Sequence, residues 1–236
     1  MEAAVQIENY FKGLLFEERS HTYTVKGLII PSVSSLLKQY ITPFDAQSVS
    51  IGTARKLDMS PREVRTIWNN VKEEACNRGT RVHNFAENYA VDRTLVPLCP
   101  QEQAAKDFWD DMPDYIVPVF MEIRMWHKIY MFAGTADLVV YNKNTKMFFL
   151  LDYKTNKDLF KNYKGQTLKY PFNAMLDTPF SKYTLQLSYY QILFEQSGFK
   201  IGGRMLIWLD KNTGKYSMYS TKDCTQTLMQ QLSMRN

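Results

Sequence analysis

Three β-rich segments follow one another between residues 115 and 154, and they constrain the fold more than any other feature of this chain. They read YIVPVFMEIRMWHKIYMF, ADLVVY and KMFFLLDYK, with turn residues at 133–134 and 142–144 between them. Runs of β-branched and aromatic residues bounded by turn residues are typical of strands. Segments with helical periodicity precede and follow them. We therefore expect an α/β fold with a central mixed sheet and helices on both faces.

The segment before the first helices predicts a small β-hairpin. HTYTV is rich in strand formers, Lys26-Gly27 supplies a turn, and LII is a short partner strand. Pro31 ends that strand, and Ser32 is a suitable N-cap for a short helix over SVSSLLKQY. Residues 42–60 are expected to be irregular.

A helix is predicted from Pro61, because Ser60 and Glu63 have the spacing of a capping box and proline favours the first helical position. Gly79 is expected to interrupt this helix, with a second helical segment over residues 80–90.

Further elements are predicted toward the C-terminus. QEQAAKDFWDDM and KYTLQLSYYQILFEQSG have helical patterns, RMLIWL and KYSMYS read as strands, and a last helix is expected near residues 225–234. We interpret residues 1–236 as a single domain, with an N-terminal hairpin and irregular segment (1–60), a core (61–210) and a C-terminal strand and helix (211–236).

Composition excludes some classes of protein. The chain has 236 residues, enough to bury a core without disulfides. Its three cysteines are scattered, so neither a four-thiolate zinc site nor a four-cysteine iron–sulfur cluster can be built. A net charge of +5 is compatible with a polyanionic partner but does not demonstrate one. Without a signal peptide or an apolar stretch of about 20 residues, a cytoplasmic protein is expected and no membrane partner.

The stretch FFLLDYKTNK ends an apolar strand with an acid and a lysine. Side chains two apart on a strand point the same way, so Asp152 and Lys154 project together. If the turn before this strand centres on residues 144–145, Asp137 of GTADLVVY falls opposite Asp152. Opposed carboxylates destabilise a hairpin unless a charge compensates, and aspartate oxygens suit Mg²⁺ or Mn²⁺. A lone Asp-x-Lys is also typical of a surface ion pair at the end of a strand.

Other polar residues have a spacing that suits a shared site. His83 and Glu87 are four apart on one predicted helical face, as are Gln186 and Tyr190, and Glu122 lies on the strand before Asp137. Imidazole can bind a metal ion. Each group also has a simpler interpretation: a His–Glu pair on a helix surface, a polar helix face, and a solvated strand position.

Taken in order, these segments resemble the PD-(D/E)xK nuclease superfamily in its RecB-like exonuclease branch. The resemblance covers residues from about 20 to 210, and its N-terminal part is similar to phage-encoded members and to the mitochondrial genome maintenance exonuclease. The segments that carry it are Gly79-Thr80-Arg81-Val82-His83 with Glu87, Glu122, Gly134 to Asp137, Asp152-Tyr153-Lys154, and Gln186 to Tyr190.

The resemblance implies a restriction-endonuclease-like core and, for a phage-encoded protein, a location in the cytoplasm of the bacterial host. It implies Mg²⁺ or Mn²⁺ as the cofactor, and no iron–sulfur cluster is expected here. It also implies roles for the residues: His83, Asp137, Asp152 and the Tyr153 carbonyl bind the metal; Lys154 is the catalytic lysine; Glu87 and Glu122 are supporting acids; Gln186 and Tyr190 orient the site and touch DNA. We expect Arg81, within the segment Gly79 to His83, and Thr155, next to Lys154, to contact DNA as well.

The segment NKDLFKNYKGQTLKYPF, residues 156–172, interleaves lysines with aromatic residues. Lysines such as Lys161 and Lys164 can follow phosphates while aromatic rings stack on bases, as in proteins that bind single strands. A solvated loop with its aromatic residues tucked inward explains the pattern equally well. The sequence thus predicts a metal-dependent DNA exonuclease that hydrolyses phosphodiester bonds in single-stranded or end-processed DNA. The alternatives are a structure-specific endonuclease of the same fold and a catalytically silent DNA-binding subunit.

Overall fold

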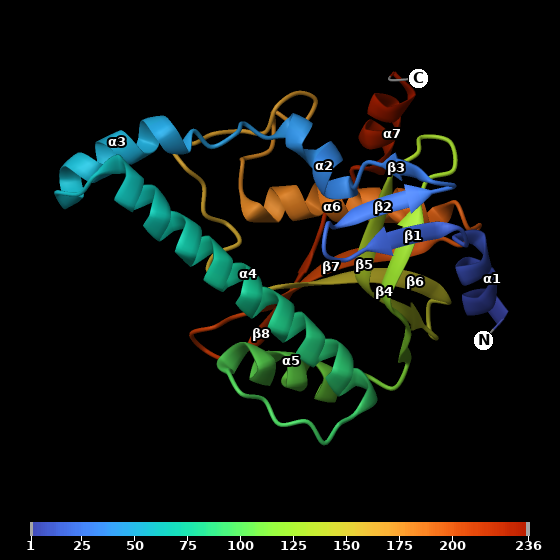
Figure 1. The fold of residues 1–236 in the computed structure, drawn as a ribbon. Helices are drawn as coiled ribbons and strands as arrows, with labels where there is room; N and C mark the ends of the chain where they lie inside the picture. Colours follow the sequence, from blue (N-terminus) through green and yellow to red (C-terminus); the bar gives the residue numbers. More distant parts are fainter. Residues whose placement is uncertain (1, 235–236) are drawn as a thin grey trace.

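The computed structural model describes residues 2–234 and has an α/β architecture with two sheets (Figure 1). The small sheet is antiparallel and contains β1 (Leu14–Glu17), β2 (Thr22–Val25) and β3 (Leu28–Ile30). The large sheet has the strand order β4-β5-β6-β7-β8, with β4 (Ile116–Trp126), β5 (Ala133–Asn142), β6 (Met147–Lys154), β7 (Ile201–Leu209) and β8 (Tyr216–Ser220). Because β6 and β7 pair in parallel and the other neighbours are antiparallel, this sheet is mixed, as predicted.

Helices cover both faces of the large sheet, which confirms the predicted layering (Figure 1). One face packs on α6 (Pro179–Glu195), with α1 (Glu2–Tyr10), α2 (Val33–Leu37) and α7 (Thr225–Ser233) around it. The other face packs on α5 (Pro100–Asp110) and on the C-terminal part of α4 (Pro61–Val91). A 3₁₀ turn, Lys38–Tyr40, and α3 (Ala46–Leu57) complete the list of helices.

The N-terminal region has more regular structure than the sequence indicated. The predicted hairpin is present as β2 and β3, and Ser32 caps α2 as expected, but α1 and β1 were not predicted. The expectation that residues 42–60 are irregular is wrong, because α3 occupies most of them. Asp45 starts this helix by accepting hydrogen bonds from the backbone N–H groups of Gln47 and Ser48. The helix buries only Ser50 and Ala54, so it lacks the apolar stripe that would reveal it.

The predicted break at Gly79 is also wrong, because α4 runs without interruption from Pro61 to Val91. Its capping box of Ser60 and Glu63 is present as predicted. Gly79 has a tertiary role instead: a Cβ atom there would lie 3.3 Å from Thr155 Oγ1, just beyond the end of β6. The glycine therefore lets α4 pass close to that strand end.

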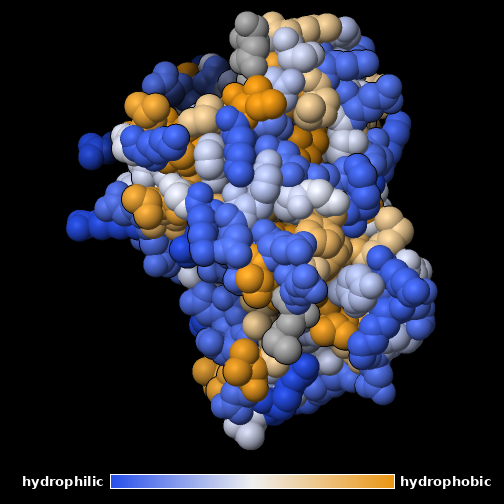
Figure 2. All heavy atoms as spheres, turned by 90° about the vertical axis from the view of Figure 1, so that its right-hand side faces the viewer, coloured by the Kyte–Doolittle hydropathy of each residue, from blue (hydrophilic) through white to orange (hydrophobic). Residues whose placement is uncertain are grey.

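The part of α4 between Val64 and Val82 has no fully buried side chain. This part of the helix therefore does not pack on the sheet, and its N-terminal end lies next to α3. Figure 1 shows α3 and this part of α4 projecting from the two-sheet body as an arm. No helix in residues 2–234 is both long and apolar enough to cross a membrane. The side of the molecule opposite the arm is mostly hydrophilic, with small apolar groups between polar ones (Figure 2).

Candidate functional site

Three carboxylates lie in a row across β4, β5 and β6. The ladder between β5 and β6 follows a register centred between residues 144 and 145, as predicted, and this register places Asp137 opposite Asp152. On the other side, the neighbouring pairs of β4 and β5 place Glu122 opposite Asp137. Glu122 has a φ of +53°, a left-handed conformation that is uncommon for a residue other than glycine. Such strain in a strand marks a position of functional interest.

Lys154 lies at the β6 end of this row, beside Asp152. Its ammonium forms an ion pair with the Oδ2 atom of Asp152, and the two side chains are only 12% and 2% exposed. The backbone N–H of Tyr153 donates a hydrogen bond to Asp137 Oδ2 at 2.9 Å, which joins the end of β6 to the middle of β5. The Lys154 ammonium also lies 4.3 Å from the centre of the Tyr183 ring on α6. The predicted acid–lysine pair is therefore largely enclosed.

His83 reaches the same row from α4. Its Nδ1 atom is 3.4 Å from Asp137 Oδ2, and its ring contacts that of Tyr153. Glu87, one turn further along α4, is half-buried and close enough to Glu122 and Asp137 to raise its pKa. The close approach of α4 to the strand end at Gly79 brings both residues to the site.

Gln186 and Tyr190 enter from α6 as a pair. The Gln186 side-chain amide donates a hydrogen bond to the Tyr190 hydroxyl at 2.7 Å. The Tyr190 ring lies over Gly134, where a Cβ atom would be only 2.7 Å from Tyr190 Cε1. Gly134 therefore leaves the space that Tyr190 fills beside Asp137.

The acids of this cluster hold their protons more tightly than free acids do. Burial, together with repulsion from Asp137, raises the pKa of Asp152 to about 6. Burial and the neighbouring carboxylates Glu122 and Asp137 raise the pKa of Glu87 to about 7. Burial is also the main reason that the pKa of Asp137 is raised. Concentrated negative charge in a poorly solvated place accounts for all three shifts.

The pKa values of the two basic groups in the cluster, Lys154 and His83, shift in opposite directions. Burial alone would lower the pKa of Lys154, but Asp152 and Asp137 outweigh it and raise that pKa, so the lysine remains charged. Burial, and then the positive charge of Lys154, lower the pKa of His83 to about 4. The imidazole of His83 is therefore neutral at physiological pH, the form in which histidine binds a metal ion.

The chemistry of the donor atoms fits a hard divalent cation. Two aspartates and a neutral imidazole offer oxygen and nitrogen ligands, and a cation would offset the repulsion that raises the pKa values of the acids. In residues 2–234, no group of three or more His, Cys, Asp or Glu side chains has an arrangement that could hold a metal ion. The candidate ligand atoms contact other protein groups instead. Asp152 pairs with Lys154, and Asp137 accepts the Tyr153 N–H and lies beside His83, so a cation would have to displace these contacts.

Two grooves open from the cluster. The first, named here the N-terminal groove, has a volume of about 490 Å³ and lies between the small sheet and α6; Glu122, Asp137, Gln186 and Tyr190 line it. The second, named here the lysine groove, has a volume of about 580 Å³ and lies between α4 and the end of β6. The residues that give it its positive charge are Lys72, Arg78, Lys154, Lys157 and Lys211, and Glu74 and His83 also line it.

Some predicted residues lie outside this arrangement. Arg81 points to α5, where its guanidinium pairs with Glu102 at 3.1 Å. Lys164 is exposed above the ring of Tyr163 and lines neither groove. Thr155 lines the lysine groove, and Lys161 lines an adjoining hollow.

The aromatic residues of the 156–172 segment divide into two groups. Phe172 is buried against Tyr40, whereas Tyr163 and Tyr170 are exposed. Phe160 is half exposed but packs on Phe180. Neither sequence interpretation of this segment, an aromatic surface or a set of inward-facing rings, therefore holds for all of it.

Sequence analysis missed Tyr183 and Arg78. Tyr183 precedes Gln186 by three positions and Tyr190 by seven, so all three share one face of α6. That spacing was available in the sequence and could have identified Tyr183. Arg78 immediately precedes Gly79, and nothing in its neighbourhood distinguishes it from a residue on an exposed helix face.

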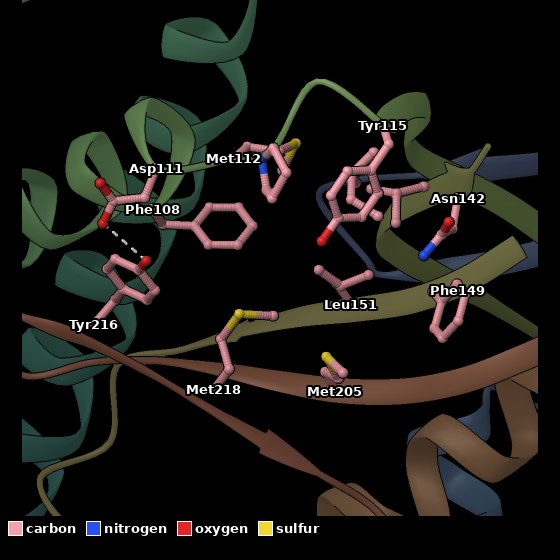
Figure 3. Close-up of a pocket in the computed structure, with 13 residues that line it drawn as sticks. Phe108, Asp111, Met112, Tyr115, Asn142, Phe149, Leu151, Met205, Tyr216 and Met218 are labelled. Carbon is pink, nitrogen blue, oxygen red and sulfur yellow. Dashed lines mark hydrogen bonds between the residues drawn. The ribbon is translucent and has the colours of Figure 1, made fainter. Parts of the chain in front are cut away.

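An apolar cavity of about 260 Å³ lies away from the cluster, between the C-terminal end of α5 and the large sheet. Figure 3 shows Phe108, Met112, Leu151 and the two methionines of β7 and β8 pointing into it. Its edge carries a hydrogen bond of 2.9 Å from the Tyr216 hydroxyl to Asp111. With few polar groups, this cavity is not suited to hydrolytic chemistry.

No family model matches this chain, and no curated protein matches it significantly. Among solved structures, one titled "Crystal structure of SSO0001" aligns with 98% of this chain and 81% of its own chain, at 12% sequence identity and a TM-score of 0.39. Neither a function nor a family can be transferred at that level of similarity.

Proposed function

We propose that this protein is a metal-dependent deoxyribonuclease that hydrolyses phosphodiester bonds from DNA ends. One observation carries the proposal: a buried Asp152–Lys154 pair at the end of β6 lies beside Asp137 in the middle of the adjacent strand β5, between two grooves. A surface ion pair would not be enclosed in this way. The order of the motifs along the sequence, with its resemblance to RecB-like exonucleases, supports the same function.

His83, Asp137, Asp152 and the Tyr153 carbonyl would hold a Mg²⁺ or Mn²⁺ ion. When bound, such an ion supplies Lewis-acid chemistry to a phosphate and lowers the pKa of water. Lys154 keeps its positive charge and can stabilise negative charge that develops on the phosphate oxygens. Glu87 and Glu122 add to the negative field that attracts a cation. Gln186 and Tyr190 hold one wall of the site in place.

The first experiment compares linear and circular DNA, single- and double-stranded, with Mg²⁺, with Mn²⁺ and with a chelator. We expect degradation of linear DNA that requires the divalent ion. Cutting of circular molecules would instead identify an endonuclease. Binding without cleavage under any of these conditions would identify a silent DNA-binding protein, and the proposed function would then be wrong.

Two variants test the site itself. Asp152→Asn keeps the shape of the side chain but removes a ligand charge, so nearly all cleavage should be lost while DNA binding remains, because phosphate contacts supply most of the affinity. Lys154→Ala should lower the cleavage rate by about two orders of magnitude at saturating metal, the effect of losing one stabiliser of the transition state.

Matched controls are available elsewhere in the chain. Asp114→Asn and Lys12→Ala make the same changes at exposed positions and should cleave at the wild-type rate. If Asp152→Asn cleaved within a few-fold of these controls, the assignment of this site would be refuted. Calorimetric titration with Mn²⁺ separates the two roles, because Lys154→Ala should still bind the ion whereas Asp152→Asn should bind it weakly.

A further inference from the structure

The lysine groove is part of a larger depression. It shares Lys72 with a hollow of about 720 Å³ that Phe44 and Trp68 also line. It shares Lys157 with another hollow, of about 850 Å³, which Phe44 lines as well. Because these hollows have walls in common, one continuous surface leads from Phe44 and Trp68 to Lys154.

The depression lies between the arm and the segment that follows β6, because residues of both line the three hollows. Figure 1 shows the backbone of α3 and the first half of α4 facing the segment of residues 156–178. Phe44 directly precedes the N-cap of α3, and Trp68 lies in the second turn of α4. Their ring centres are 5.6 Å apart, with an angle of 60° between the ring planes.

Packing between α3 and α4 does not explain this aromatic pair. Phe44 is 67% exposed, so its ring remains largely in water even though it contacts Trp68. The two helices are joined by a hydrogen bond of 2.9 Å from the Arg65 guanidinium to the Ser50 hydroxyl, and each helix also buries an apolar side chain, Ala54 on α3 and Val64 on α4. Leaving a phenylalanine ring in water is unfavourable unless a ligand covers it.

Positive charge surrounds the pair and continues toward the cluster. Its members are Arg65, Lys72, Arg78, Lys157 and Lys161. The same walls also carry acids. Asp177 is offset by its ion pair with Lys182, which leaves Asp45, Asp158 and Glu74. The five cations named above outnumber these three acids.

An exposed phenylalanine ring that contacts a partly buried tryptophan, beside a path of cations, is suited to one kind of ligand. A single strand of nucleic acid offers unpaired bases, which stack on aromatic rings, and phosphates, which lysine and arginine contact. A duplex keeps its bases stacked inside and offers the rings no free face. The depression thus matches a single strand better than a double strand.

We propose that Phe44 and Trp68 form a stacking site for a base of single-stranded DNA, whose backbone then follows the lysine groove to Lys154. This inference rests on the proposed nuclease function and names the form of its substrate. Phe44 and Trp68 are binding residues in this view and take no part in the hydrolysis.

Binding of an oligodeoxythymidylate of about 12 nucleotides, a length in the range that such sites occupy, tests the stacking site. A chelator is included so that no cleavage occurs. Phe44→Ala and Trp68→Ala should each weaken binding by about 5-fold to 100-fold, the loss expected for one stacked base. Trp68→Phe retains a ring and should bind within about 3-fold of wild type. Tyr115→Ala removes an exposed aromatic ring on the link from α5 to β4 and serves as the control.

A second ligand separates stacking from charge. In an oligonucleotide of the same length with abasic sites, the phosphates remain but the bases are gone. Wild type and both alanine variants should bind this ligand equally well. Tryptophan fluorescence adds a direct signal, because a base stacked on Trp68 should quench its emission, and Trp68→Phe should lose that quenching while it keeps its affinity.

Each outcome bears on one proposal or the other. Equal binding of the thymidylate by wild type and both alanine variants would overturn the stacking site, even if the enzyme cleaves DNA. If Phe44→Ala and Trp68→Ala lost as much affinity for a blunt duplex as for the thymidylate, the preference for single strands would be overturned. If wild type neither bound nor cleaved any DNA, the proposed function itself would fail.

Discussion

Gly134 shows how a single residue shapes the candidate site. The ring of Tyr190 occupies the space where a side chain at this position would lie, and Tyr190 in turn receives the hydrogen bond from Gln186. The sequence contains this glycine in a recognisable motif, but the reason for it is a contact with a helix far along the chain. Local patterns cannot reveal such a contact.

Gly134→Ala should therefore destabilise the protein by about 1–3 kcal/mol, the usual cost of overpacking a core. It should also reduce cleavage, because Tyr190 must move away from Asp137. Urea unfolding followed by circular dichroism measures the stability. Gly52→Ala is the matched control: nothing lies within 4 Å of the new Cβ atom on α3, so this change should be neutral or stabilise by up to about 1 kcal/mol. Equal stability of the two variants would contradict the contact.

At the scale of elements, the turn between β4 and β5 depends on His127. Its ring is buried, lies against Phe132 and accepts hydrogen bonds at Nδ1 from the N–H groups of Ile129 and Tyr130. Burial lowers the pKa of His127 to about 4. The imidazole must be neutral to accept these bonds, so the turn and the protonation state are linked.

This linkage gives a dependence of stability on pH. In the unfolded chain, His127 gains a proton below its ordinary pKa of about 6.5, whereas in the folded protein it stays neutral until the pH approaches 4. Its contribution is thus complete above pH 6.5 and is lost as the pH falls toward 4, by up to about 3 kcal/mol. In His127→Asn, the side-chain oxygen can still accept the bonds but does not titrate. We expect the free energy of unfolding of this variant, measured with urea between pH 7 and 4, to fall less steeply with decreasing pH than that of wild type. The difference in slope should correspond to the uptake of one proton.

His21→Asn changes the same residue type in an exposed turn and should keep the wild-type slope. An unchanged slope in His127→Asn would show that the buried ring does not control the pH dependence.

Strand pairing was the part of the fold that sequence reasoning predicted best. The register between β5 and β6 follows from the turn alone, and with it the opposition of Asp137 and Asp152. The predictions for two helices are wrong. The pattern of α3 is too polar to indicate a helix, and the sequence predicts a break at Gly79 because it does not reveal the proximity of this residue to Thr155. The sequence does not predict the pair of Phe44 and Trp68 either, because these residues are distant in the sequence and meet only in the folded protein.

At the scale of the whole molecule, the chain separates into a two-sheet body and the arm of α3 and α4. The candidate site lies where they meet, at Gly79 and the end of β6. The predicted core of residues 61–210 includes the site but omits α3, so the proposed path of the substrate depends on a segment for which the sequence predicts no regular structure.

The lack of fully buried side chains between Val64 and Val82 has a consequence for local unfolding. The free energy of opening should differ along α4, although it is one unbroken helix: high after Val82, where the helix packs on the sheet, and low before it. In hydrogen–deuterium exchange, amides of residues 65–78 should therefore exchange faster than those of residues 82–90. Uniform protection along α4 would show instead that the arm and the body open together. A bound single strand should slow exchange in the arm and leave the rest of the helix unchanged, so the arm would gain its rigidity from the substrate.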